Sequence, residues 1–310
     1  MNHQLNHPQA EQAVLRLLKA AVPERSSEID DLWKKYKPAV QISEDSPGTS
    51  IDATRHRIRF DNKTMRAIWL IGFNGWNCLS LYSPAVVLAQ IFNLSIDQIL
   101  GEDDERGRLE FDYRSRSSLA ERLVSASSPD AITWPEDIPE PGSDRENLTS
   151  DQEKVTFDLV CMATAYVFLH EFRHVMFDSD GDRPSARLEE ETSCDVWARA
   201  FMTEKIGEYA RATTQPHQSF LQKRAMAMAL GAIILHDLTP ETGRWGSEDY
   251  PPIADRIHSM VSGIGPSLDS NYWLFAACLL IGVFRRSGRS LPMTISDNRK
   301  LVDDLIEQLR

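Results

Sequence analysis

The chain has 310 residues, of which 42% are hydrophobic and 26% charged, a balance typical of globular proteins. Its formal net charge of -12 argues against a nucleic-acid partner, which usually requires a basic face, and against electrostatic docking on an anionic membrane. The N-terminal segment lacks the basic start and apolar stretch of a secretory signal, and the 4 cysteines form no CxxC pair. We therefore expect a cytoplasmic protein without disulfides that binds neither nucleic acid nor membrane.

The N-terminal part of the chain mixes helix and strand patterns. Residues 9–22 repeat apolar side chains at helical spacing and predict an amphipathic helix. Residues 55–61 alternate basic and apolar side chains as a strand does, and a turn is expected at 62–64. The apolar segment 65–92 fits either a strand or a helix, and its length favours the helix. These patterns place an N-terminal α+β region at residues 1–132.

Proline and acidic residues are concentrated just after this region, which predicts an extended linker at 133–150 that crosses the surface. Helical periodicity dominates the rest of the chain, which is assigned to a helical region at 151–310. The two regions can share one core, and the predicted fold class is mainly α with a small α+β part at the N-terminus. The predicted helices of the C-terminal region are 151–177, 184–211, 219–237, 251–262, 271–285 and 296–309.

An HExxH motif, formed by His170, Glu171 and His174, lies inside the almost wholly apolar stretch YVFLHEFRHVMFD. Burying a polar group without a partner costs roughly 1–3 kcal/mol, so these side chains should have partners. On an α-helix, residues i and i+4 share one face, so the two imidazoles can bind a single metal ion. Zinc suits imidazole ligands and leaves one position for water. The alternative is two core histidines bonded to backbone carbonyls.

Glu171 lies about 100° around the helix from His170, where it does not ligate the metal. Its carboxylate can still reach a water at the metal and take the proton of that water, which then attacks a carbonyl carbon. The motif therefore predicts zinc-dependent hydrolysis with Glu171 as the general base.

A second predicted helix, RLEEETSCDVWARAFMTEK, supplies candidates for a third metal ligand. Its apolar side is centred on Glu191, and Asp195 lies on the same side at i+4. We expect Glu191 to bind zinc and Asp195 to accept the other ring N–H of a ligating histidine. Glu189 faces solvent and Glu190 lies at the border of the buried side, and both fit solvated acids near a helix start.

The spacing of HExxH and the downstream ExxxD resembles that of the gluzincin metallopeptidases. In addition, ordered blocks over roughly residues 55–285 resemble the Lit-type phage-exclusion peptidases. The blocks are RAIWLIGFNGW, TWPEDIPEP, the HExxH helix, EETSCDVWA, ALGAIILHDL and YPPIADRIHSMV.

The Lit-type resemblance implies a zincin-like helical core and a cytoplasmic zinc endopeptidase of antiphage defence. It implies translation elongation factor Tu as the substrate and a phage-derived peptide as the activator. It makes His170 and His174 metal ligands and Glu171 the base, and it aligns Glu191 and Asp195 with the acidic motif of the family.

One position departs from the family pattern, because Tyr250 stands where the family has a histidine before proline. Either Tyr250 or His258 can then stabilise the transition state, and the alternative is that Tyr250 merely precedes a helix with proline in its first turn. His236 and Asp237 do not form a good metal pair, since adjacent helical residues point about 100° apart. His236 is instead expected to interact with the last carbonyls of its helix.

Two other functions remain open from the sequence. One is a metal-containing binding or sensor module without proteolysis, and Glu171 argues against it because such a module needs no base. The other is a repressor-cleaving HExxH regulator, although neither a helix-turn-helix signal nor a basic patch appears in the chain.

Overall fold

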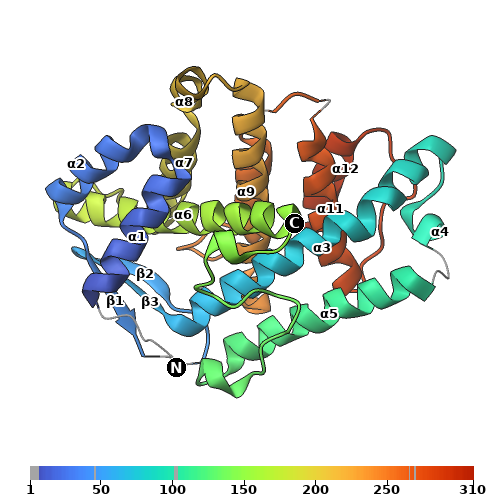
Figure 1. The fold of residues 1–310 in the computed structure, drawn as a ribbon, viewed down its shortest axis with the longest axis horizontal. Coiled ribbons are helices and arrows are strands. Elements are labelled where there is room, and N and C mark those ends of the chain that lie inside the picture. Colours follow the sequence, from blue (N-terminus) through green and yellow to red (C-terminus); the bar gives the residue numbers. More distant parts are fainter. Residues whose placement is uncertain (1–6, 45–46, 101–103, 265, 269) are drawn as a thin grey trace.

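A computed structural model of the chain describes residues 7–44, 47–100, 104–264, 266–268 and 270–310. A long helix, α6 (Asp151–Asp180), runs through the centre of the molecule, and most other elements pack around it (Figure 1). By length and composition α6 could cross a membrane, but 72% of its most apolar window is buried inside the protein, as in the core helix of a globular fold. The fold is mainly α with a small N-terminal sheet, which confirms the predicted class.

Both ends of α6 are fixed by local interactions. Ser150 caps the N-terminus in a capping box, in which its hydroxyl accepts from Glu153 N while the Glu153 carboxylate accepts from Ser150 N. Gly181 ends the helix in a left-handed conformation with φ of 71°, which glycine adopts without strain. These caps fix where α6 begins and where it ends.

The helices around α6 bury its apolar surface on several sides. α1, α3, α7 and α9 contact it directly, α11 packs against α3 and α9, and α12 covers α11 (Figure 1). The remaining helices lie at the periphery. The bounds are α1 His7–Ala21, α2 Ser26–Tyr36, α3 Asn62–Phe92, α4 Ile96–Leu100, α5 Asp104–Ser125, α7 Arg187–Thr203, α8 Ile206–Thr213, α9 His217–Leu238, α10 Ile253–Ser262, α11 Asn271–Arg286 and α12 Asn298–Leu309.

The sheet has three strands in the order β1-β3-β2, with bounds β1 Ala39–Ser43, β2 Ile51–Thr54 and β3 Arg57–Asp61. β1 runs parallel to β3, and β2 pairs antiparallel to β3 through a tight connection in which His56 takes a φ of 59°. β2 is therefore an edge strand, and it also packs against α6. This places the edge of the sheet beside the helix that carries the HExxH motif.

Several sequence-based boundaries differ from the structure. The turn predicted at 62–64 is wrong, because the Asp61 side chain accepts from Thr64 N and starts α3 at Asn62. The helix predicted over 184–211 is interrupted between Thr203 and Ile206, giving α7 and α8. Core side chains come from both sides of residues 133–150, and the domain division at that segment stays a prediction.

Candidate metal centre

α6 places His170 and His174 one turn apart on a buried face. Their ring centroids are 5.0 Å apart, and their Nε2 atoms approach to 3.2 Å. Only 5% of His170 and 2% of His174 is exposed. Both rings line a cavity of about 410 Å³, so a ligand can reach them despite their burial.

Glu191 of α7 brings a carboxylate to the same two nitrogen atoms. Its Oε2 lies 3.2 Å from His170 Nε2, and its Oε1 lies 3.4 Å from His174 Nε2. Burial raises the pKa of Glu191, but the hydrogen bond from His170 and the charges of both histidines outweigh this and hold the pKa below its usual value. Two imidazoles and one carboxylate thus converge on one point, which is a donor set suited to a metal ion.

Asp195 fixes the orientation of the His170 ring from behind. Its Oδ1 lies 2.8 Å from His170 Nδ1 and accepts from the Tyr166 hydroxyl at 3.2 Å. Arg256 of α10 donates to both carboxylate oxygens, each at 2.8 Å. Burial lowers the pKa of His170, but the charge and hydrogen bond of Asp195 outweigh it and raise the pKa to about 9 in the metal-free protein. Asp195 is therefore the centre of a buried polar network.

Glu190 does not face solvent, which corrects the expectation from the helical pattern. Only 1% of it is exposed, and its Oε1 lies 2.5 Å from His174 Nδ1. The first turn of α7 lies against α6, and Arg187 and Arg183 provide cations at 3.1 and 3.5 Å from this carboxylate. Each histidine thus has its own carboxylate partner at Nδ1, which leaves Nε2 for the metal side.

A buried cluster of His170, His174 and Cys194 could also bind a metal ion. The Cys194 sulfur, however, lies 3.5 Å from Nδ1 of His174, on the side of the ring that already bonds to Glu190. Burial and the neighbouring acids raise the pKa of the Cys194 thiol, which disfavours the thiolate that ligates metals. The two possible third ligands thus lie on opposite sides of the His174 ring, Cys194 at Nδ1 and Glu191 at Nε2.

Glu171 lines the same cavity as the two histidines. It is 9% exposed, and burial raises its pKa to about 7, with the charge of Glu191 adding to the effect. A carboxyl group that titrates near neutral pH can both accept and return a proton, as a general base must.

The structure separates the two candidates for transition-state stabilisation. Tyr250 lines the cavity, is 49% exposed and lies with its ring 5.9 Å from the Arg187 guanidinium carbon. His258 is exposed on α10 and is not among the residues that line the cavity. Arg256, on the same helix, does line it, because two residues along a helix rotate the side chain by about 200°.

Sequence reasoning gave no role to several residues of this site. Glu190, Cys194 and Arg187 are on the helix of the predicted residues, and Tyr166 precedes His170 by one turn. Arg256 reaches Asp195 only through the packing of α10. His236 does not interact with the last carbonyls of α9 as expected, because its Nδ1 bonds to Asp237 Oδ1 at 2.9 Å beside a different cavity.

Comparison with known proteins identifies the family of this fold and site. The model of the Peptidase U49 family matches residues 58–276, which include α6, α7 and Tyr250. Neither the curated proteins nor the solved structures yield a match to the chain. Because the family model covers more than half of the sequence, the chain belongs to the Peptidase U49 family.

Proposed function

We propose that this peptidase is a zinc endopeptidase in which His170, His174 and Glu191 hold the ion. The proposal rests on the convergence of His170 Nε2, His174 Nε2 and the Glu191 carboxylate. The two nitrogens are 3.2 Å apart, and the carboxylate places Oε2 at 3.2 Å from the first and Oε1 at 3.4 Å from the second. Ligands at 2.0–2.2 Å from a tetrahedral zinc ion lie about 3.3–3.6 Å from one another. The donor groups therefore have the chemistry that zinc requires, and their contacts are close to this spacing.

Zinc, when bound, supplies polarisation of a carbonyl oxygen and lowers the pKa of a water. The carboxylates of Asp195 and Glu190 accept from the Nδ1–H groups of the two histidines, which fixes the tautomer that presents Nε2. Glu171, whose pKa burial raises to about 7 in the metal-free protein, takes the proton from the attacking water and delivers it to the leaving amine. Tyr250, at the rim of the cavity, can donate its hydroxyl to the oxyanion.

The edge strand β2 supports a protein as the substrate. Ile51, Asp52 and Ala53 of β2 line the cavity that holds the histidines. Within the described residues β2 pairs with β3 alone, so its other edge can accept an extended peptide as an added strand. A polypeptide bound in this way would pass along the edge strand next to Glu171.

We further propose, from the Lit-type resemblance, that the enzyme acts in the cytoplasm in antiphage defence. The substrate proposed on this basis is translation elongation factor Tu, and the activator is a phage-derived peptide. The membership of the Peptidase U49 family supports the proteolytic part of this proposal.

Expression of wild type and Glu171→Gln in bacteria, with and without phage, tests the proposal. Elongation factor Tu is followed on a gel, and new protein N-termini are labelled across the proteome. We expect cleavage in infected cells with wild type alone, since general-base catalysis supplies ~10²–10⁴-fold in rate. New N-termini in other proteins, with elongation factor Tu intact, would identify a different substrate. An unchanged defence phenotype with Glu171→Gln would favour a sensor without proteolysis.

A further inference from the structure

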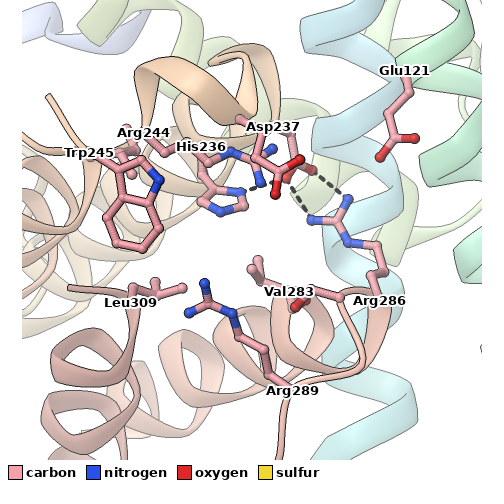
Figure 2. Close-up of a pocket in the computed structure, with 12 residues that line it drawn as sticks. Glu121, His236, Asp237, Arg244, Trp245, Val283, Arg286, Arg289 and Leu309 are labelled. Carbon is pink, nitrogen blue, oxygen red and sulfur yellow. Dashed lines mark hydrogen bonds and ion pairs between the residues drawn. The ribbon is translucent and has the colours of Figure 1, made fainter.

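A second cavity, of about 240 Å³, lies beside the C-terminal end of α9 (Figure 2). His236 and Asp237 line it, whereas Leu235 and Leu238 of the same helix line the metal cavity. The other walls come from α5, α10, α11, α12 and the loop between α9 and α10. The remaining lining residues are Glu121, Glu241, Arg244, Trp245, Ile253, Val283, Arg286, Ser287, Arg289 and Leu309.

The buried charges at the back of this cavity compensate one another. Asp237 binds Arg286 through two contacts of 2.6 and 2.9 Å and accepts from His236 Nδ1 at 2.9 Å (Figure 2). The bidentate pair matches the Arg286 guanidinium to the Asp237 carboxylate, so these two charges compensate each other.

Two other arginines of the cavity have no carboxylate partner among the described residues. Arg289 donates to Gln308 O at 2.8 Å, and its guanidinium extends into the open space below His236 (Figure 2). Arg244 donates through Nε to Thr239 O at 3.2 Å. Glu121 lies at the opposite end, beyond the Asp237–Arg286 pair (Figure 2). Glu241 also lines the cavity. What distinguishes the part between Arg289 and Trp245 is therefore the set of guanidinium N–H groups that form no ion pair with a carboxylate of the described residues.

His236 and Trp245 give this part of the cavity the features of a built site. Only 5% of His236 is exposed, and its Nε2 faces the open space without a hydrogen-bond partner in the described structure (Figure 2). Trp245 is 62% exposed and flanks the same space with its indole ring. Val283 and Leu309 add apolar surface below it. His236 is thus a nearly buried polar side chain whose Nε2 is open to the cavity, and Trp245 offers an aromatic face beside it, as the polar and apolar groups of a small-molecule site do.

We propose that this cavity binds a small organic anion, with a phosphate or carboxylate at Arg289 and Arg244 and a planar group stacked on Trp245. Guanidinium groups match both of these anions in shape and charge. His236 Nε2 provides a further polar contact to the ligand. At about 240 Å³ the cavity suits a small molecule rather than a polymer.

The loop of the second cavity also forms a wall of the metal cavity. Glu241, Arg244 and Trp245 line the second cavity, whereas Thr239 and Tyr250 line the metal cavity. Arg244 bonds to residues of both cavities. Its Nε donates to the carbonyl oxygen of Thr239, which lines the metal cavity, and its own carbonyl accepts at 2.9 Å from the N–H of Ile253, which lines the second cavity. A ligand that holds Arg244 and Trp245 would thus hold Tyr250 as well. This consequence for catalysis rests on the proposed function.

Calorimetric titration with four probes tests the site. The probes are adenosine 5′-monophosphate, N-acetylphenylalanine, inorganic phosphate and adenosine. The first two compare a phosphate with a carboxylate as the anion. The last two supply the anion without the ring and the ring without the anion. We expect at least one of the first two to bind with a Kd below about 1 mM, and the last two to bind at least ~10-fold more weakly. Failure of both ring-bearing anions to bind would overturn the proposal.

Variants locate the binding. Arg289→Gln should weaken the binding of the anion ~10–100-fold, while Arg211→Gln, on an exposed arginine of α8 that lines neither cavity, should not. Binding that is indifferent to Arg289→Gln would place the ligand elsewhere and overturn the assignment. Binding should persist in Glu171→Gln, so the result does not depend on the peptidase mechanism. Hydrogen exchange at 239–252 should slow with ligand, and unchanged exchange would contradict the coupling to Tyr250.

Discussion

Asp195→Ala tests the polar network behind the two histidines of the HExxH motif. Asp195 accepts at 2.8 Å from His170, twice at 2.8 Å from Arg256 and at 3.2 Å from Tyr166. Removing it leaves the Arg256 cation, whose side chain is 15% exposed, without its carboxylate. Breaking a buried ion pair in this way costs about 3–5 kcal/mol. The ring of His170 also loses its orienting partner, which typically weakens metal affinity ~10–100-fold.

Urea unfolding of the metal-free protein at pH 7 measures the first effect, and competition with a chelating dye measures the second. Asp195→Asn should lose less stability than Asp195→Ala, because the amide oxygen can still accept hydrogen bonds. Glu189→Gln, at an exposed acid of the same helix, is the matched control and should stay within about 0.5 kcal/mol of wild type. A loss under about 1 kcal/mol for Asp195→Ala, together with unchanged zinc affinity, would refute the reasoning.

Three further predictions follow from the contacts of the site and of the second cavity. Glu191→Ala should remove most of the bound metal, whereas Cys194→Ser should retain it, as measured by elemental analysis. The reverse result would make Cys194 the third ligand in place of Glu191. Glu190→Gln should still bind the metal, but with an affinity at least ~10-fold lower in dye competition. An affinity equal to that of wild type would show that Glu190 does not support the metal site. Burial raises the pKa of Asp237, but the charge of Arg286 outweighs it and holds the pKa well below its usual range. Because this pKa is depressed on folding, the stabilisation is present above the unfolded pKa of about 3.9 and is lost as pH falls below it. The difference in unfolding free energy between wild type and Asp237→Asn should therefore be constant from about pH 7 to 5 and shrink below about pH 4. A difference that stays constant in urea titrations down to about pH 3 would contradict this.

Local periodicity was sufficient to place the main residues of the candidate site on their helices. His170 and His174 share a face of α6, and the helical phase of α7 directs Glu191 and Asp195 inward, because both patterns depend only on the 3.6-residue turn. The same helical phase placed Glu190 at the border of the buried side of α7. The burial of Glu190 depends on the packing of α7 against α6 and on the cations of Arg183 and Arg187.

Contacts between residues far apart in the sequence, and short or ambiguous local patterns, explain the other features that were not predicted. The bond between Arg256 and Asp195 joins residues 61 positions apart, and no local signal predicts it. β1 and β2 were missed because strands of 5 and 4 residues with partly exposed side chains show too little alternation. The start of α3 resembled a turn, since the residues that cap a helix are also those that favour turns.

Anomalous diffraction at the zinc edge, from crystals of the purified protein, tests the central claim most directly. The account predicts one peak per chain, at about 2.0–2.2 Å from His170 Nε2, His174 Nε2 and one carboxylate oxygen of Glu191. The peak should be lost in the double variant His170→Ala/His174→Ala. A peak bonded to Cys194 Sγ and His174 Nδ1, or no peak in crystals of a proteolytically active preparation, would contradict it.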